Sequence, residues 1–312
     1  MKVIDLRQSA DLTIPRPETG DEPENYVREI VERVRSQGDQ ALIDLAREFD
    51  GVDLTPESLR VSEAEIDVGL SSISKELRAA IDEAASRIRK FAEHQVIPEW
   101  NDSIGGGLLG EVVEPVERAG LYAPGGRAVY PSVVLMGAVP ASVAGVQSVA
   151  LCVPPASNGG VPAPTLAAAA IAGVSEIYRV GGPQAIAAMA YGTKTIKKVS
   201  VIAGGGGLLV ALAKKEVAGV VAIDSVAGPS EIAIIADETA DALTVTCDLI
   251  AQAEHGPHGS FVLLTWDEQL FSDVQSNVKT QLDNVQASSD LRSDLEEGLV
   301  IAQVSGADQA LQ

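Results

Sequence analysis

The chain has 312 residues, of which 44 are Asp or Glu and 23 are Lys or Arg, so its formal net charge is −21 at pH 7. A surface of that sign repels phosphate backbones, which argues against nucleic-acid binding. No apolar run reaches the ~18 residues of a membrane span and the N-terminus lacks the apolar core of a signal peptide, so the sequence predicts a cytoplasmic protein without a membrane partner.

The composition favours an α/β protein. Apolar side chains make up 46% of the residues but aromatic ones only 4%, which indicates an interior of Ala, Val, Ile and Leu, as in parallel sheets covered by helices. A chain of this length is expected to form two domains. Cys152 and Cys247 lie in apolar stretches without CxxC spacing, so both are interpreted as buried structural thiols in a reducing compartment.

The first third of the chain is expected to be mainly helical. Residues 1–23 contain three prolines among polar side chains and are interpreted as an N-terminal arm. Apolar positions recur with helical spacing over 24–49 and again over 75–94. After the glycine run 105–107, residues 109–121 have the pattern of an extended strand.

Short β-branched runs then alternate with Ala-rich segments. The expected strands are 149–153, 176–180, 199–202 and 220–223. The helices expected between them are 164–172, 183–191 and 208–217. This βαβ alternation predicts a parallel sheet with right-handed crossovers.

A second set of alternating elements begins at residue 231. Its expected strands and helices are 232–235, 240–255, 261–265, 268–283, 289–299 and 300–304. We therefore predict an α/β protein of two Rossmann-like parallel-sheet units, the second inserted in the first, with a helical N-terminal region. The predicted boundaries are an arm over 1–23, a first α/β domain formed by 24–119 and 231–312, and an inserted domain over 120–230.

The glycine run Gly204–Gly207 follows an expected strand and opens a helix, where backbone N–H groups could hold a phosphate. It departs from the GxGxxG fingerprint because the third glycine would fall on Leu209, although Asp224 lies twenty residues after Gly204. A phosphate loop and an ordinary loop before a helix both remain open. For Tyr122, stacking on a ligand and closing the core both remain open, and Gln184 could bind a ligand or cap its helix.

The segment 224–259 gathers a glycine-proline turn, a hydroxyl, an amide and a histidine. Its turn should place Ser230 on a loop facing a cleft. Gln252 and His255 stand three apart at the end of the expected helix, so they share a face. An imidazole beside a carboxamide oxygen suits Zn²⁺, but two ligands do not fill its shell.

The chain holds three histidines in all. His94 ends a charged helix and is interpreted as a solvated surface residue. His258 follows a Gly-Pro turn and is not assigned a role.

Four motifs in order resemble those of the histidinol dehydrogenases. They are AGPSE at 227–231, QAEHGP at 252–257, a GLYxPGG segment within 118–126 and a GGxQAIAA segment within 179–188. The resemblance runs from residues 4–7, IDLR, to the last residue. It implies NAD-dependent oxidation of L-histidinol to L-histidine through histidinal, in two steps, by a zinc-containing homodimer.

The resemblance also assigns residues. The family's dinucleotide contacts correspond to Tyr122, Gln184 and the position of Gly207, where the family has Asn. Its substrate contacts correspond to Ser230, Gln252 and His255, and the last two correspond to zinc ligands. The Asn-to-Gly departure removes a side-chain donor and acceptor from the dinucleotide loop.

Family members continue more than a hundred residues past the position of Gln312, through a PEH motif whose Glu and His act in catalysis. The resemblance therefore assigns no catalytic residue within this chain, and the remaining zinc ligands also lie further on. We expect a fragment of a longer chain, ending within a helix, with impaired activity. The alternative is a non-catalytic dinucleotide-binding, metal-binding or dimerisation module.

Overall fold

The computed structural model describes residues 1–7, 21–125, 129–227, 231–255, 259–285 and 288–312. The chain divides into two compact units. One is formed by residues 1–19 and 228–312, and here it is called the terminal unit. The other, residues 20–227, is called the central unit.

The central unit contains a five-stranded parallel sheet in the order β6-β5-β4-β7-β8. Its strands are β4 (Arg118–Tyr122), β5 (Ser148–Val153), β6 (Glu176–Arg179), β7 (Val201–Ala203) and β8 (Ala222–Ile223). The register pairs Tyr122 with Cys152 and Leu121 with Ala203. The parallel sheet and its βαβ order confirm the predicted fold class.

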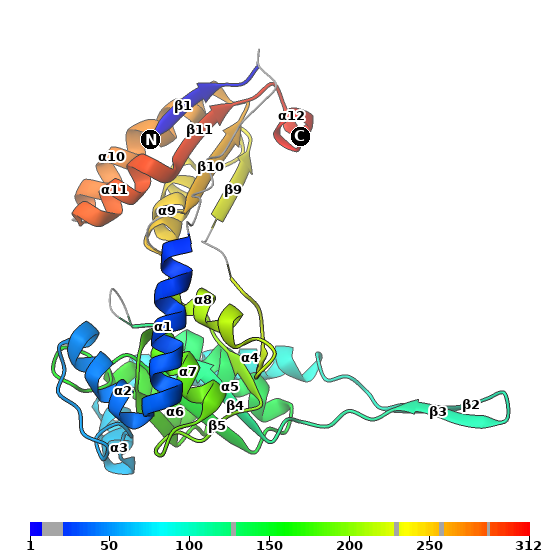
Figure 1. The fold of residues 1–312 in the computed structure, drawn as a ribbon. Coiled ribbons are helices and arrows are strands. Elements are labelled where there is room, and N and C mark those ends of the chain that lie inside the picture. The colour runs from blue at the N-terminus through cyan, green and yellow to red at the C-terminus, as the bar shows by residue number, and fades with distance from the viewer. Residues whose placement is uncertain (8–20, 126–128, 228–230, 256–258, 286–287) are drawn as a thin grey trace. The chain divides into compact units, whose positions relative to one another are not determined.

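Helices cover both faces of this sheet (Figure 1). On one face lie α3 (Glu63–Ser72), α4 (Lys75–Glu93), α5 (Pro131–Val143) and α6 (Ala163–Ile171). On the other lie α1 (Asp21–Gln37), α2 (Asp39–Leu45), α7 (Gly182–Tyr191) and α8 (Leu208–Val217). The small side chains of α7 are buried throughout most of the helix, which allows it to lie between the sheet and α1.

The expected helix over 24–49 is interrupted. Gly38 has a left-handed backbone, φ 60°, between α1 and α2. After α2 the chain continues as a π-helical turn, η1 (Ala46–Asp50), which ends at Gly51, φ 65°. Glycine adopts such angles without steric cost, and this explains why the helix changes direction where periodicity alone predicts continuity.

A two-stranded hairpin replaces the single strand expected over 109–121. It consists of β2 (Trp100–Ile104) and β3 (Gly107–Glu111), joined by Gly105 and Gly106, both with positive φ. Two positive φ angles are the signature of a type I′ turn, which matches the twist of a hairpin. The hairpin projects from the central unit, and all its residues are exposed (Figure 1). The sheet strand β4 begins only at Arg118.

The terminal unit contains a four-stranded parallel sheet in the order β1-β11-β10-β9. Its strands are β1 (Lys2–Asp5), β9 (Glu231–Ala236), β10 (Ser260–Thr265) and β11 (Leu299–Gln303). One face packs on α9 (Ala242–Ala253), α10 (Glu268–Asn284) and α11 (Ser289–Gly298). A short helix, α12 (Ala307–Ala310), follows β11, and Ala310 packs on the other face.

Two parts of the predicted organisation differ from the structure. Within the predicted arm, residues 2–5 form β1, whose backbone pairs with β11. The helices of residues 21–93 pack on the sheet of the central unit, so residues 24–119 group with 120–227 and not with 231–312. The reason is apolar packing of α1 on α7 and α8 and of α3 and α4 on α5 and α6. None of the helices in the described part of the chain has the length and apolar character needed to cross a bilayer.

Candidate functional site

The carboxyl ends of β4 and β7 form the point where the winding of the sheet reverses. The chain runs from β4 through α5 to β5 on one side, and from β7 through α8 to β8 on the other. In open parallel α/β sheets, ligands bind in the crevice at such a switch point. Tyr122 ends β4, Gly207 caps α8, and Gln184 lies in the first turn of α7. The elements that carry the three predicted dinucleotide contacts therefore start or end on this side of the sheet.

Gly204 allows β4 and β7 to approach closely at the switch point. It directly follows β7 with φ 116°, and a Cβ there would lie 2.1 Å from the carbonyl oxygen of Tyr122. Its N–H donates to Asp224 Oδ2 at 3.0 Å, and its carbonyl accepts from Lys214 Nζ at 3.0 Å. Lys214 is buried and forms an ion pair with Asp224. The start of the glycine run is therefore fixed, and Asp224 is occupied by the protein's own groups.

The pKa of Asp224 agrees with a role in fixing the start of the glycine run. Burial by itself would raise the pKa of Asp224, but hydrogen bonds from Lys214 and from the N–H groups of Gly204 and Ser225 lower it below its usual value. The carboxylate is thus ionised in the folded protein. It positions the loop through Gly204 and Lys214.

Tyr122 is buried, and its hydroxyl accepts a hydrogen bond of 3.0 Å from the N–H of Gly182. Burial raises the pKa of Tyr122 to about 12; the Gly182 hydrogen bond opposes the rise, while Cys152 and Asp50 add to it. The phenol consequently keeps its proton at neutral pH and can donate it to an acceptor. Tyr122 both closes the core and presents a polar tip.

Gln184 is 2% exposed, and within the described residues its Oε1 is buried without a hydrogen-bond partner. The same oxygen lies 2.7 Å from where a Cβ on Gly182 would stand. Because Gly182 bonds to Tyr122, the amide oxygen and the phenol are close neighbours at the start of α7. A buried acceptor left unpaired is costly, so a ligand that donates to it would be favoured.

Gly207 is the N-cap of α8 and provides no side-chain cap. Its φ is −65°, and a Cβ there would meet no atom within 4 Å, so the position accepts other side chains. The first N–H groups of a helix are unpaired donors with a partial positive charge, which suits a phosphate. The loop therefore keeps its backbone donors despite the absent Asn side chain.

Asp50 was not expected at this site. It ends η1, and its carboxylate contributes to the raised pKa of Tyr122. Its Oδ2 is buried without a hydrogen-bond partner among the described residues, and this burial raises the pKa of Asp50. The sequence offers only Asp-Gly at a helix end, a common turn signal, which does not distinguish Asp50 from other acids.

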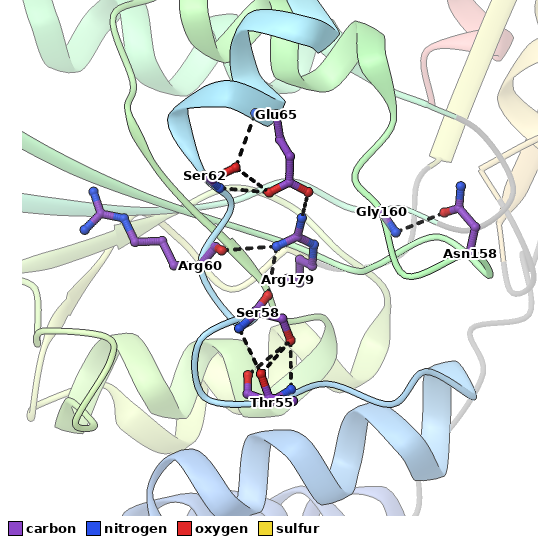
Figure 2. Close-up of polar contacts among 8 residues, drawn as sticks. All are labelled: Thr55, Ser58, Arg60, Ser62, Glu65, Asn158, Gly160 and Arg179. Carbon is purple, nitrogen blue, oxygen red and sulfur yellow. Dashed lines mark hydrogen bonds and ion pairs between the residues drawn. The ribbon is translucent and has the colours of Figure 1, made fainter.

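Beside Asp50 lies a cleft of about 400 Å³. It is lined by Gly51, Val52, Asp53, Leu54, Ser58, Ser157, Asn158, Gly159 and Arg179. Arg179, at the end of β6, is 5% exposed and donates through Nη1 to the carbonyls of Ser58 at 2.8 Å and Arg60 at 3.1 Å (Figure 2). Its Nη2 donates to Glu65. Arg179 thus ties the loop before α3 to the sheet and fixes one wall of the cleft.

In the terminal unit, Gln252 and His255 lie side by side, as their spacing predicts. Gln252 is in the last turn of α9, and His255 follows the helix end by two residues. Gln252 Nε2 is 2.8 Å from His255 Nδ1, and the pair is exposed. This contact occupies Nδ1, and no other described residue bonds to Nε2 of the imidazole.

The predicted substrate residue Ser230, and His258, lie outside the described residues. The convergence of Ser230 with Gln252 and His255 therefore stays a prediction. A search of the described residues finds no group of three or more His, Cys, Asp or Glu side chains that could hold a metal ion. One imidazole and one carboxamide fall short of the four ligands usual for zinc, so the described donors do not form a complete zinc site.

Three further expectations concern single residues. His94, the C-cap of α4, is exposed, as predicted. Cys152 is buried, as predicted, and burial raises its thiol pKa to about 12. The prediction for Cys247 is wrong, because it lies on the exposed side of α9, whereas Val245, Thr246 and Leu249 face the core.

Comparisons with known proteins agree with the four motifs. The family model for histidinol dehydrogenase matches residues 15–312. A histidinol dehydrogenase of Synechococcus sp. is 52% identical over 260 residues, which are 83% of this chain and 60% of the relative. That of Methanothermobacter thermautotrophicus is 42% identical over 286 residues, 91% of this chain and 67% of the relative.

The fold agrees as well. A crystal structure of histidinol dehydrogenase from Elizabethkingia anophelis has a TM-score of 0.87 and 35% identity, and the match covers 98% of this chain and 71% of that one. The chain spans 60% of the length of the Synechococcus relative. The motifs, the family match and the shared fold lead to one conclusion: this chain belongs to the histidinol dehydrogenase family.

Proposed function

We propose that this chain is the cofactor-binding part, and a portion of the substrate-binding part, of an NAD-dependent L-histidinol dehydrogenase. In the proposed reaction L-histidinol loses two hydrides in succession to two NAD⁺, through histidinal and its hydrate, and yields L-histidine. Family membership supports the reaction. The observation that carries the dinucleotide site is the buried, unpaired Gln184 Oε1 beside the Tyr122 phenol.

The described residues fit a dinucleotide in their donors and acceptors. Gln184 Oε1 can accept from the ligand and the protonated Tyr122 hydroxyl can donate to it. The N-terminus of α8 offers backbone N–H groups for a phosphate, and Gly204 brings the two strand ends together beneath it. Bound NAD⁺ would supply the hydride acceptor, and the protein's part is to position it.

For the substrate, we propose that Gln252 and His255 act with Ser230 at one end of the terminal unit. The imidazole and amide of the first two are already adjacent. The resemblance to the family implies that Gln252 and His255 hold zinc, together with ligands that lie further along the chain. Since the described donors do not complete that shell, we derive no catalytic step from zinc and expect the 312-residue chain to retain little of it on dialysis against a mild chelator.

The remaining parts of the proposal follow the family. We propose a cytoplasmic homodimer. The second candidate is a non-catalytic module that binds a dinucleotide or pairs with a complete subunit. It is favoured by Gly207 at the Asn position.

Binding and turnover separate the two candidates. We expect the purified chain to bind NAD⁺ by calorimetry but to form little NADH from L-histidinol, because a positioned acid or base contributes ~10² to 10⁴ in rate. Joining the C-terminal third of a relative should restore turnover. Histidine formation by the 312-residue chain within about tenfold of a full-length relative, under saturating conditions, would contradict the expected impairment.

Gln184→Leu tests the dinucleotide site directly. We expect NAD⁺ affinity to fall about tenfold while the melting temperature stays equal or rises, because an unpaired buried acceptor is removed. Loss of affinity together with a lower melting temperature would indicate a structural role only. Unchanged NAD⁺ affinity would contradict the site.

A further inference from the structure

The carboxylate of Asp50 lacks a hydrogen-bond partner for one of its two oxygens among the described residues. Its Oδ2 is buried without a partner within the described part of the chain. Moving a carboxylate out of water is expensive unless hydrogen bonds replace those of the solvent. A group of this kind in a native protein calls for a specific partner.

The local backbone presents Asp50 at a defined position. It ends the π-helical turn η1, and Gly51, φ 65°, then turns the chain so that residues 51–54 line the cleft. π-Helical turns inside helices are frequent at functional sites. Asp50 adjoins the cleft through Gly51, and the same cleft is lined by Arg179, which ends β6 three residues before Gly182. The cleft therefore adjoins Asp50 on one side and, on the other, the chain that leads from β6 into α7, the helix that carries Gln184.

The charges of the cleft select against a phosphate inside it. Arg179 is the only cation among the described lining residues, and its donors are directed at two carbonyls and at Glu65 (Figure 2). Asp53, also in the lining, is paired with exposed Arg47 at 2.5 Å. Asp50 adds a further negative charge at the cleft's edge. An uncharged planar base suits this volume and lining better than a phosphorylated group does.

We propose that Asp50 accepts hydrogen bonds from the vicinal hydroxyls of the adenosine ribose, with the adenine in the cleft, and thereby makes the site selective for NAD⁺ over NADP⁺. This rests on the proposed dinucleotide site. A carboxylate suits a free 2′-hydroxyl because it accepts from it, and it repels a 2′-phosphate. The ribose hydroxyls thus provide the donors that Oδ2 of Asp50 lacks among the described residues.

The test compares the dissociation constants of NAD⁺ and NADP⁺, measured by calorimetry with the 312-residue chain. For Asp50→Asn we expect NAD⁺ to bind about tenfold more weakly and NADP⁺ to change by less than about threefold, so that the preference for NAD⁺ shrinks. Asp50→Ala should lose at least as much NAD⁺ affinity. Asp44→Asn, which makes the same change of charge on α2 outside the cleft, should leave both constants unchanged.

The melting temperature provides a second readout. Because Asp50→Asn removes an unpaired buried charge, it should keep or raise the melting temperature while it weakens NAD⁺, a combination that a purely structural carboxylate would not give. NAD⁺ binding by the unaltered chain with an NAD⁺ to NADP⁺ ratio that does not respond to Asp50 would overturn this proposal alone. Failure of the unaltered chain to bind either nucleotide would overturn the proposed function and this proposal with it.

Discussion

Among single residues, Arg118 and Glu176 form an ion pair with two contacts in the central sheet. They begin β4 and β6, the strands on either side of β5, and bond through two contacts of 2.7 and 2.8 Å. Both side chains are largely buried. The hydrogen bonds from Arg118 lower the pKa of Glu176 to about 2. Paired geometry of this kind is strong and directional.

Replacing Glu176 by Gln should make stability depend less on pH. A carboxyl whose pKa is lower in the folded state stabilises the fold above its unfolded pKa, near 4.5, and loses this contribution as the pH falls towards 2. We expect the variant to lose on the order of 2 kcal/mol of unfolding free energy at pH 7, and the difference to shrink between pH 4.5 and 2. Urea denaturation at several pH values measures it.

The matched control is Glu83→Gln, which breaks an exposed pair with Arg87 on α4. Exposed pairs of this spacing contribute only ~0.3–0.5 kcal/mol. A pH-independent difference for Glu176→Gln, or an equal effect in the control, would refute the assignment.

Gly207 is the second residue whose change is informative. Because a Cβ there meets nothing within 4 Å and the N-cap has no side-chain bond, Asn fits without strain. We expect Gly207→Asn to tighten NAD⁺ binding several-fold, since a side-chain amide is restored at the start of α8, and to change stability by only a few tenths of a kcal/mol. Calorimetry with Gly207→Ala as control separates the amide from the loss of glycine. Equal affinity in all three proteins would contradict a contact at this position.

At the level of elements, periodicity predicted most of the fold. The alternation from β5 to β8 and from β9 to β11 was found within a few residues because buried parallel strands have a β-branched signature. Helix α5 was not predicted, since it is apolar on every side and contains Pro140. Helix α3 was also missed, although its Ser62–Glu65 capping box was a readable signal.

The candidate site was only partly visible in the sequence. The motifs pointed to Tyr122 and Gln184. Without them, the sequence did not decide whether Tyr122 stacks on a ligand or closes the core, or whether Gln184 binds a ligand or caps its helix. Asp50 could not be predicted as a site residue. It is distinguished by the burial of its Oδ2, which depends on segments that are distant in the sequence. The same holds for Lys214, whose ion pair with Asp224 is made across a folded loop. Tertiary contacts of this kind have no local pattern.

The close approach of β7 to β4 predicts that Gly204 does not tolerate substitution by a larger residue. A Cβ on Gly204 would lie 2.1 Å from the backbone oxygen of Tyr122, and φ is 116°. We expect Gly204→Ala to cost about 3 kcal/mol or more in unfolding free energy, because neither backbone can yield easily. Gly205→Ala, one residue on with nothing within 4 Å, is the control and should cost little. Chemical denaturation of both proteins decides the matter, and similar values would contradict the tight approach.

At the level of the whole molecule, the two units have separate cores. The core residues of the central unit lie between Val27 and Val221, and those of the terminal unit are Leu6 and residues from Ala236 onwards. Units without shared core residues are expected to unfold in separate steps.

The two tryptophans make this testable, since Trp100 belongs to the central unit and Trp266 to the terminal unit. In a Trp100→Phe protein, fluorescence reports on the terminal unit alone, while circular dichroism reports on both. We expect the two signals to have different midpoints in urea, and residues 21–227 expressed alone to keep a cooperative transition. Coincident midpoints in the full chain, with no transition in the fragment, would show one cooperative structure.

The pairing of β1 with β11 has a consequence for synthesis on the ribosome. Lys2 is partnered with Val300, so β1 is synthesised long before the strand with which it pairs. At ~5–20 residues per second the delay is about 15–60 seconds, which is long enough for the central unit to fold first. During that interval β1 lacks its partner strand, and its backbone groups are open to pairing with neighbouring chains on the same messenger. The order of translation therefore gives chaperones a period in which β1 needs protection from pairing with other chains.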